Sequence, residues 1–122
     1  MSLSAGPDDL LLLHNPRCSK SRQLLAALNE RGASFRVRQY LEEPLDAVEL
    51  RALFSAEGQP AIQGVRAKEA EFTEAGLSRT SDEDAIIAAV VRFPKLLERP
   101  VLVRGERAAI GRPTEAALTL LD

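Results

Sequence analysis

A strand–helix–strand unit near the N-terminus is the feature that most constrains the fold of this 122-residue chain. The continuous apolar run Leu10–Leu13 is typical of a buried strand. After a loop that contains Asn-Pro, leucines recur at helical spacing from about Ser19 to Arg31, and Gly32 supplies a stop. A second strand is predicted over Ser34–Leu41, where apolar and polar residues alternate. Two strands joined by a helix within about thirty residues pair in parallel, with a right-handed crossover.

The middle of the chain is predicted to be helical. Asp46 and Glu49 have the spacing of a capping box for a helix that ends at Gly58. A further helix is expected over roughly Gly64–Ala75, stopped by Gly76. A third helix is expected to begin near Ser81 and to end at Pro94. The residues expected to face inward from it are Ile86, Ile87, Val90 and Val91.

The C-terminal part predicts a hairpin and a closing helix. Pro100–Val103 is a β-branched run, residues 104–106 form a turn, and Ala108–Ile110 returns as a strand. The closing helix is expected over Thr114–Leu121. The order βαβ, helices, ββα predicts an α/β fold of the thioredoxin-like type, with a mixed sheet and a helical insertion at about residues 45–97. We expect a single domain over residues 10–122, preceded by a disordered leader at residues 1–9.

Composition excludes several classes of protein. The net charge of −2 gives no reason to expect nucleic acid or an acidic membrane as partner. No apolar run approaches the roughly 20 residues that span a bilayer, and the start lacks the basic region of a secretory signal. One cysteine and one histidine cannot build the four-ligand set of a structural zinc site without several carboxylates, so no bound metal is expected. A cytoplasmic protein without an internal disulfide is therefore expected.

Cys18 is the candidate nucleophile. It lies where the first strand has ended and the first helix begins, and the unpaired N–H groups at a helix start stabilise a thiolate. The alternative is a buried, inert cysteine that acts as a small hydrophobic residue. The surrounding run HNPRCSKSR is polar and basic, which favours the reactive interpretation.

Two residues near Cys18 bear on how its thiol could react. His14 is the only histidine, and it either supports the thiolate electrostatically or is a hydrogen-bonded structural residue. Ser21 stands where a Cys-x-x-Cys motif would have its second cysteine. An oxidised Cys18 must therefore be resolved by an outside thiol.

Four segments together resemble the ArsC family, the glutaredoxin-coupled arsenate reductases. His14-Asn15-Pro16-x-Cys18, followed by Ser21 and Arg22, looks like the family's active-site loop. Similar segments follow in order: RAKEAEFTEAGL at residues 66–77, ERPVLV at residues 98–103 and GRPTE at residues 111–115. The resemblance runs from about residue 11 to residue 121, and the short YfgD-like members, with the loop NPRCSKSR, are the most similar branch.

The resemblance implies a function residue by residue. Cys18 matches the cysteine that forms a covalent ester with arsenate, and His14 matches a histidine that helps to keep it ionised. The arginines that match the oxyanion ligands are Arg66, Arg99 and Arg112. Asn15, Ser21, Arg22 and Pro100 match the supporting loop and the cis-proline that faces it, so the 99–100 peptide is predicted to be cis. No bound cofactor is expected; glutathione is the implied co-substrate and glutaredoxin the implied protein partner.

The residues also leave alternatives open. Each of the three arginines also has an alternative interpretation without a ligand. Arg66 would then be an exposed helix residue, Arg99 would pair with Glu98 or Glu83, and Arg112 would pair with Glu115. The loop here reads Cys-Ser-Lys-Ser, whereas the reductases usually have Cys-Gly-Thr-Ser, which changes the shape and charge around an oxyanion. A related glutathione-dependent thiol reductase with another substrate is therefore a second hypothesis. A third is a non-enzymatic transcriptional regulator of the Spx type, which often has the second cysteine that Ser21 replaces.

Overall fold

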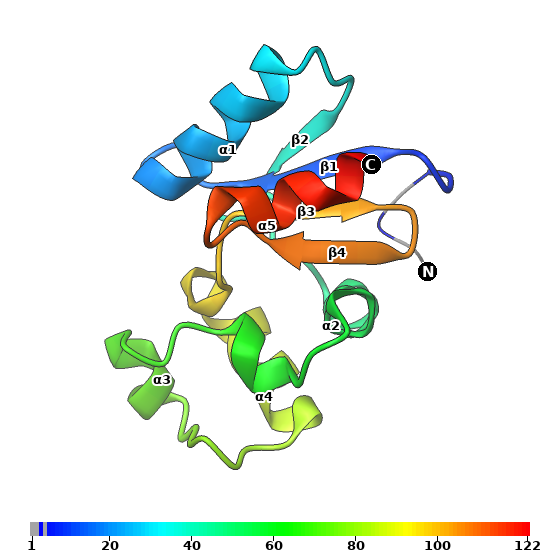
Figure 1. The fold of residues 1–122 in the computed structure, drawn as a ribbon. Helices are drawn as coiled ribbons and strands as arrows, with labels where there is room; N and C mark the ends of the chain where they lie inside the picture. Colours follow the sequence, from blue (N-terminus) through cyan, green and yellow to red (C-terminus); the bar gives the residue numbers. More distant parts are fainter. Residues whose placement is uncertain (1–2, 4) are drawn as a thin grey trace.

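A four-stranded mixed sheet forms the centre of the protein. The computed structural model describes residue 3 and residues 5–122. The strands are β1 (Leu10–His14), β2 (Arg36–Gln39), β3 (Val101–Arg104) and β4 (Arg107–Ile110), in the order β2-β1-β3-β4 (Figure 1). β1 pairs in parallel with β2 and antiparallel with β3, and β3 pairs antiparallel with β4. The predicted βαβ unit and C-terminal hairpin are both confirmed.

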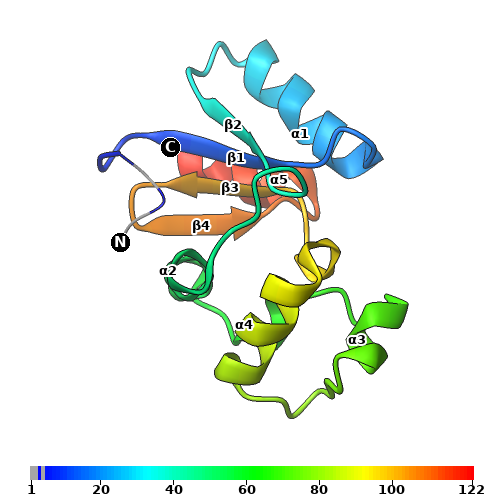
Figure 2. The same ribbon diagram turned by 180° about the vertical axis from the view of Figure 1, so that it is seen from behind.

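Helices cover both faces of this sheet. On one face lie α1 (Ser19–Glu30), α5 (Thr114–Leu118) and the 3₁₀ turn η3 (Thr119–Leu121). Figure 2 shows the molecule from behind, with α5 on the far side of β3 and β4. The segment between the two halves of the sheet supplies the elements of the other face. These are α2 (Ala47–Glu57), η1 (Ala61–Gly64), α3 (Ala70–Glu74), α4 (Glu83–Arg92) and η2 (Pro94–Leu96).

The alternation of side chains along β1 explains the two layers. Leu12 packs into the cluster with α1 and α5, whereas Leu11 and Leu13 point into the cluster under the helical insertion. All three leucines are at most 2% exposed, so a continuous apolar run is what a central strand covered on both faces requires. The thioredoxin-like fold with its helical insertion is confirmed.

The helix expected over residues 64–75 is wrong in extent. Only Ala70–Glu74 is α-helical. Gly64 ends η1, Val65 and Arg66 pair with the segment before β3, and residues 67–69 form a turn. Val65 forms a bridge with Leu97, and the N–H of Arg66 donates to the carbonyl of Leu96 at 2.8 Å. These long-range bonds remove Val65 and Arg66 from any helix and bring that segment beside Arg99.

Two smaller expectations also differ from the structure. Val91 was expected to face inward but is 47% exposed, because α4 packs through Ile86, Ile87 and Val90. The second strand is shorter than residues 34–41, and its Val37 is 46% exposed on the edge of the sheet. The capping box of Asp46 and Glu49 is present as predicted.

The segment before β1 makes defined contacts with the sheet. Asp9 pairs with Arg36 at 2.5 Å, and Asp8 pairs with Arg104 at 3.0 Å. Residues 1, 2 and 4 of the expected leader lie outside the described residues, and the disorder expected for residues 1–9 stays a prediction. In the part of the chain that the structure describes, no helix is long and apolar enough to cross a membrane.

Gly111 provides a test of how tightly β4 packs against α1. A Cβ built on it would lie 2.9 Å from Cγ of Pro100 and 3.1 Å from Cδ2 of Leu24. We expect Gly111→Ala to lower the free energy of unfolding by about 1–3 kcal/mol, because the overpacked site must move a proline ring or a core leucine. Urea denaturation measures this change. Gly6→Ala is the control, since nothing lies within 4 Å of its added Cβ, and equal midpoints for the two variants would contradict the packing.

Candidate active site

The register of the sheet brings three distant segments to one edge. Leu13 pairs with Val101, so the loop after β1 faces the residues before β3. Val101 in turn pairs with Ile110, which places the chain after β4 beside Pro100. The loop of Cys18, the 98–100 segment and the 111–113 segment therefore converge, although roughly 80 to 95 residues separate the first from the others in sequence.

Cys18 is the N-cap residue of α1, and its side chain caps no backbone group. It is 8% exposed, so the thiol is nearly covered. Its N–H donates to the carbonyl of Asn15 at 3.0 Å, which closes the loop into a turn. Cys18 thus stands at the start of a twelve-residue helix, as predicted, and no N–H of the first turn donates to its sulfur in the described part of the chain.

Asn15, Ser21 and Arg22, three of the residues predicted to support this loop, make hydrogen bonds within it. The N–H of Asn15 donates to Oγ of Ser21 at 3.3 Å, and Ser21 is fully buried. Oδ1 of Asn15 accepts from the N–H of Arg17, and Nη1 of Arg22 donates to the carbonyl of Pro16, both at 3.0 Å. The serine thus has a structural reason to be present where a second cysteine is absent.

Arg112 is the arginine in direct contact with the sulfur. Its Nη2 donates to Sγ of Cys18 at 3.7 Å. Its Nε donates to the carbonyl of Arg99 at 2.7 Å and lies 3.1 Å from Oε1 of Glu98. The partner is therefore Glu98 and not Glu115, and the carboxylate helps to fix the guanidinium against the thiol.

Arg99 offers donors that have no protein partner. Its Nε and Nη1 are buried and make no hydrogen bond among the described residues, while its backbone N–H donates to Glu98 at 3.2 Å. The Arg99–Pro100 peptide is cis, as predicted, and the Arg112–Pro113 peptide, for which no prediction was made, is cis as well. Buried guanidinium donors without acceptors are costly in a folded protein, so their presence points to an anionic ligand.

Arg66 is placed differently from the other two arginines. It lies outside any helix, so it is not the exposed helix residue of the alternative interpretation. Its guanidinium pairs with Glu69, which also lies 3.6 Å from Lys95. The positive charge of Arg66 lowers the pKa of the Tyr40 hydroxyl, whereas the charge of Cys18 raises it. Arg66 thus lies near the site, with its own charge already partly neutralised.

His14 ends β1 and is 5% exposed. Burial lowers the pKa of this histidine, and the positive charge of Arg22 lowers it further. Both effects favour the neutral imidazole over the charged ring, and a role of His14 in supporting a thiolate stays a prediction. Nδ1 has no hydrogen-bond partner in the described part of the chain, so a role in orienting a ligand stays a prediction.

Tyr40 is a site residue that sequence reasoning missed. It follows β2 directly and is 1% exposed. Burial raises the pKa of its hydroxyl far above the usual range, the charge of Cys18 acts in the same direction, and Arg66 and Asn15 act against them. The available signal was the parallel pairing of the first two strands, because the carboxyl ends of parallel strands meet at the same edge of a sheet.

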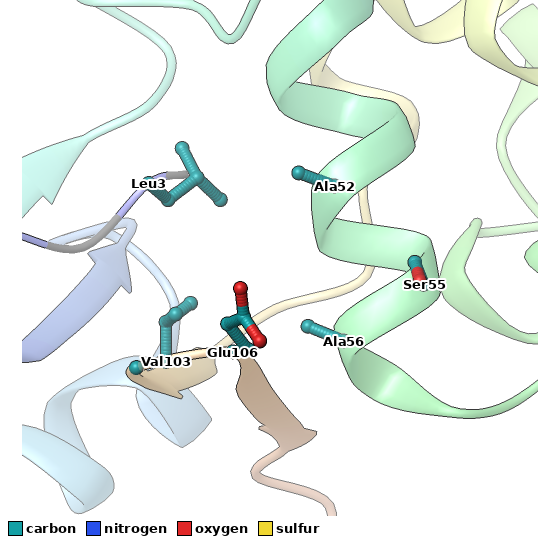
Figure 3. Close-up of a pocket in the computed structure, with 7 residues that line it drawn as sticks. Leu3, Ala52, Ser55, Ala56, Val103 and Glu106 are labelled. Atoms are coloured by element: carbon teal, nitrogen blue, oxygen red, sulfur yellow. The ribbon is translucent and has the colours of Figure 1, made fainter. Parts of the chain in front are cut away.

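Two surface hollows differ in whether they include residues of this site. One, of about 380 Å³, lies between α2 and the β3–β4 hairpin and includes Leu3, Ala52 and Glu106 (Figure 3). It contains none of the predicted site residues. A second hollow, of about 480 Å³, includes Glu98 and Arg112, and Arg112 is the residue that it shares with the site of Cys18. Over the described residues, no group of three or more histidine, cysteine or carboxylate side chains could hold a metal ion.

Comparison with known proteins gives consistent matches. The ArsC family model matches residues 13–120. An arsenate reductase of Neisseria meningitidis is 41% identical over 109 residues, covering 88% of this chain and 93% of the relative. The Escherichia coli protein YfgD is 45% identical over 112 residues, covering 90% and 94%. A solved structure, an arsenate reductase from Vibrio cholerae, has a TM-score of 0.87 at 36% identity and covers 94% of this chain and 99% of its own.

The contact between Arg112 and Cys18 predicts a change in thiol reactivity. We expect Arg112→Ala to slow the alkylation of Cys18 by iodoacetamide at neutral pH by roughly 5-fold, because one partly exposed charge contact with the thiolate is worth about 1 kcal/mol. Mass spectrometry of quenched samples gives the rate. Arg107→Ala, an exposed arginine of β4, is the matched control and should react at the wild-type rate. Equal rates in all three proteins would show that the contact does not act on the sulfur.

Proposed function

The chain belongs to the ArsC family, and from that premise we propose that it reduces arsenate to arsenite with Cys18 as nucleophile. One observation supports this function above the others: Cys18 contacts one guanidinium group, and a second lies in the same site with buried donors that lack acceptors. A tetrahedral oxyanion supplies those acceptors and carries the atom that a thiolate attacks. Permanently charged, forked guanidinium groups suit such an anion better than ammonium groups do.

The first proposed step is the attack of the Cys18 sulfur on arsenic. An S–As bond forms, and one arsenate oxygen leaves as water after protonation. The reactants are both anions, so the step needs positive charge at the arsenate oxygens. Arg99 and Arg112 supply that charge at the edge where the three segments meet, and Arg66 adds to it once an anion draws its guanidinium away from Glu69.

The later steps need electrons from outside the chain. Ser21 cannot form a disulfide with Cys18, so glutathione is the proposed second thiol. Its sulfur displaces another arsenate oxygen as water, giving an arsenic bonded to both sulfurs. A thiolate of glutaredoxin then takes the glutathione sulfur as a mixed disulfide, and the released electron pair converts arsenic(V) to arsenic(III). Water frees arsenite and returns Cys18. The proposed compartment is the cytoplasm, where thiols are kept reduced.

A coupled assay tests the function. Purified protein with glutathione, glutaredoxin and glutathione reductase should oxidise NADPH when arsenate is added, and Cys18→Ser should abolish the signal. We expect Arg99→Ala to lower kcat/KM by roughly 100-fold, the loss found when one preorganised donor to a developing anion is removed. Arg107→Ala serves as the control and should retain wild-type turnover.

The same assay separates the competing functions. Wild-type turnover in Arg99→Ala would refute the oxyanion site. Absence of arsenate turnover, with Cys18 glutathionylated by glutathione disulfide, would favour a thiol reductase for another substrate. Recovery of RNA polymerase in a pull-down, with no arsenate turnover, would favour the regulator.

A further inference from the structure

The hollow that shares Arg112 with the site of Cys18 has an unusual polar lining. The end of α2 and the turn after it contribute Glu57, Gln59 and Gln63, and the segment before β3 contributes Glu98. Residues 108–110 of β4, together with Ala116, form an apolar wall. Its volume of about 480 Å³ lies within the range of small-molecule sites.

One polar group of the hollow lacks a hydrogen-bond partner in the part of the chain that the structure describes. Glu98 is engaged by Nε of Arg112 and by the backbone N–H of Arg99. Glu57, in contrast, has a buried Oε2 without a hydrogen-bond partner among the described residues. A buried carboxylate oxygen is rarely left unpaired, so a ligand with a donor group would remove a cost that the protein otherwise carries.

The chemistry of the lining selects a ligand with both charge signs. Glu57 matches an ammonium group, and Arg112 together with the two glutamine amides matches a carboxylate. An α-amino-acid end carries these two groups on one carbon. We propose that this hollow binds the α-amino-acid end of the small thiol that completes the reaction, an inference that rests on the proposed function.

The position of the hollow explains why the ligand would be the thiol. Arg112 lines the hollow and also donates to Sγ of Cys18, so a molecule held there would contact the same guanidinium group that contacts the reacting sulfur. Cys18 is nearly covered, and a second thiol has to approach it from a bound position. Glutathione and free cysteine share the amino-acid end, and they differ in the distance from it to the sulfur.

Protonation of Glu57 makes the affinity for the proposed ligand depend on pH. Burial raises the pKa of Glu57 to about 7, and the negative charge of Glu98 acts in the same direction. The charged groups that face it across the hollow are Glu98 and Arg112. An ammonium group binds the ionised carboxylate, so affinity rises as the pH is raised through the pKa. From about pH 6.0 to 7.5 the ionised fraction of such a group grows roughly 8-fold, and the affinity should follow.

Direct binding to the full-length Cys18→Ser protein tests the site without any turnover. S-methylglutathione, which cannot react, is titrated by calorimetry at both pH values, alongside its N-acetyl derivative and S-methylcysteine. We expect S-methylglutathione to bind roughly 8-fold more tightly at the higher pH. The N-acetyl derivative should bind at least about 10-fold more weakly, since it lacks the ammonium group. Binding of S-methylcysteine as tight as that of S-methylglutathione would identify free cysteine as an equal ligand.

Variants locate the site. Glu57→Gln is nearly isosteric and should remove the pH dependence, and Gln63→Ala, an exposed change, should weaken binding with little effect on folding. Glu106→Gln is the matched control, because this carboxylate lines the other hollow. NMR shifts of the backbone amides of residues 108–110 should follow the titration. No binding at millimolar concentration, or equal binding by Glu57→Gln, would overturn the inference, even where arsenate turnover is present.

Discussion

The antiparallel pairing of β1 with β3 is the constraint on which the site depends. Each strand contributes few residues to the site itself, but the register Leu13↔Val101 fixes what lies just beyond the strand ends. Because β1 runs toward that edge and β3 runs away from it, the residue after one strand meets the residue before the other. A register shift of one residue would turn Leu12 toward the wrong layer and would also separate Arg99 from Cys18. Core packing and site geometry are therefore secured by the same pairing.

Two arginines of the site differ in how many of their nitrogens have hydrogen-bond partners. Arg112 is held by Glu98 and by a backbone carbonyl, whereas two nitrogens of Arg99 are buried without acceptors in the described residues. The first arginine is thus fixed before a ligand arrives. The second carries a desolvation cost that an oxyanion removes on binding. Burial raises the pKa of the nearby Glu57 to about 7, and the negative charge of Glu98 acts in the same direction.

The sequence predicted correctly those parts of the molecule that depend on a few neighbouring residues. The apolar run at residues 10–13, the capping box of Asp46 and the cysteine at a helix start can each be recognised from a few neighbouring residues. The conformation of residues 64–69 could not, because Val65 and Arg66 are kept out of a helix by pairing with residues 96–98, about thirty positions later. Tyr40 was missed for a related reason: nothing around it is unusual in sequence, and it becomes a site residue only through the parallel register of β1 and β2. The role of Glu57 depends on where the last turn of α2 packs, which no local pattern reveals.

The loop of Cys18 departs from the usual reductase pattern at Ser19 and Lys20. Ser19 and Lys20 are the first residues of α1, both are exposed, and no residue other than glycine has a positive φ angle in the described chain. The backbone around Cys18 therefore does not need a glycine in order to form the helix start, and its N–H groups keep their direction. What changes is the exposed surface at the start of α1, where Lys20 adds a positive charge. The sheet register and the buried Ser21 hold the loop of Cys18 by contacts that involve neither Ser19 nor Lys20, so these two residues leave the position of the cysteine unchanged.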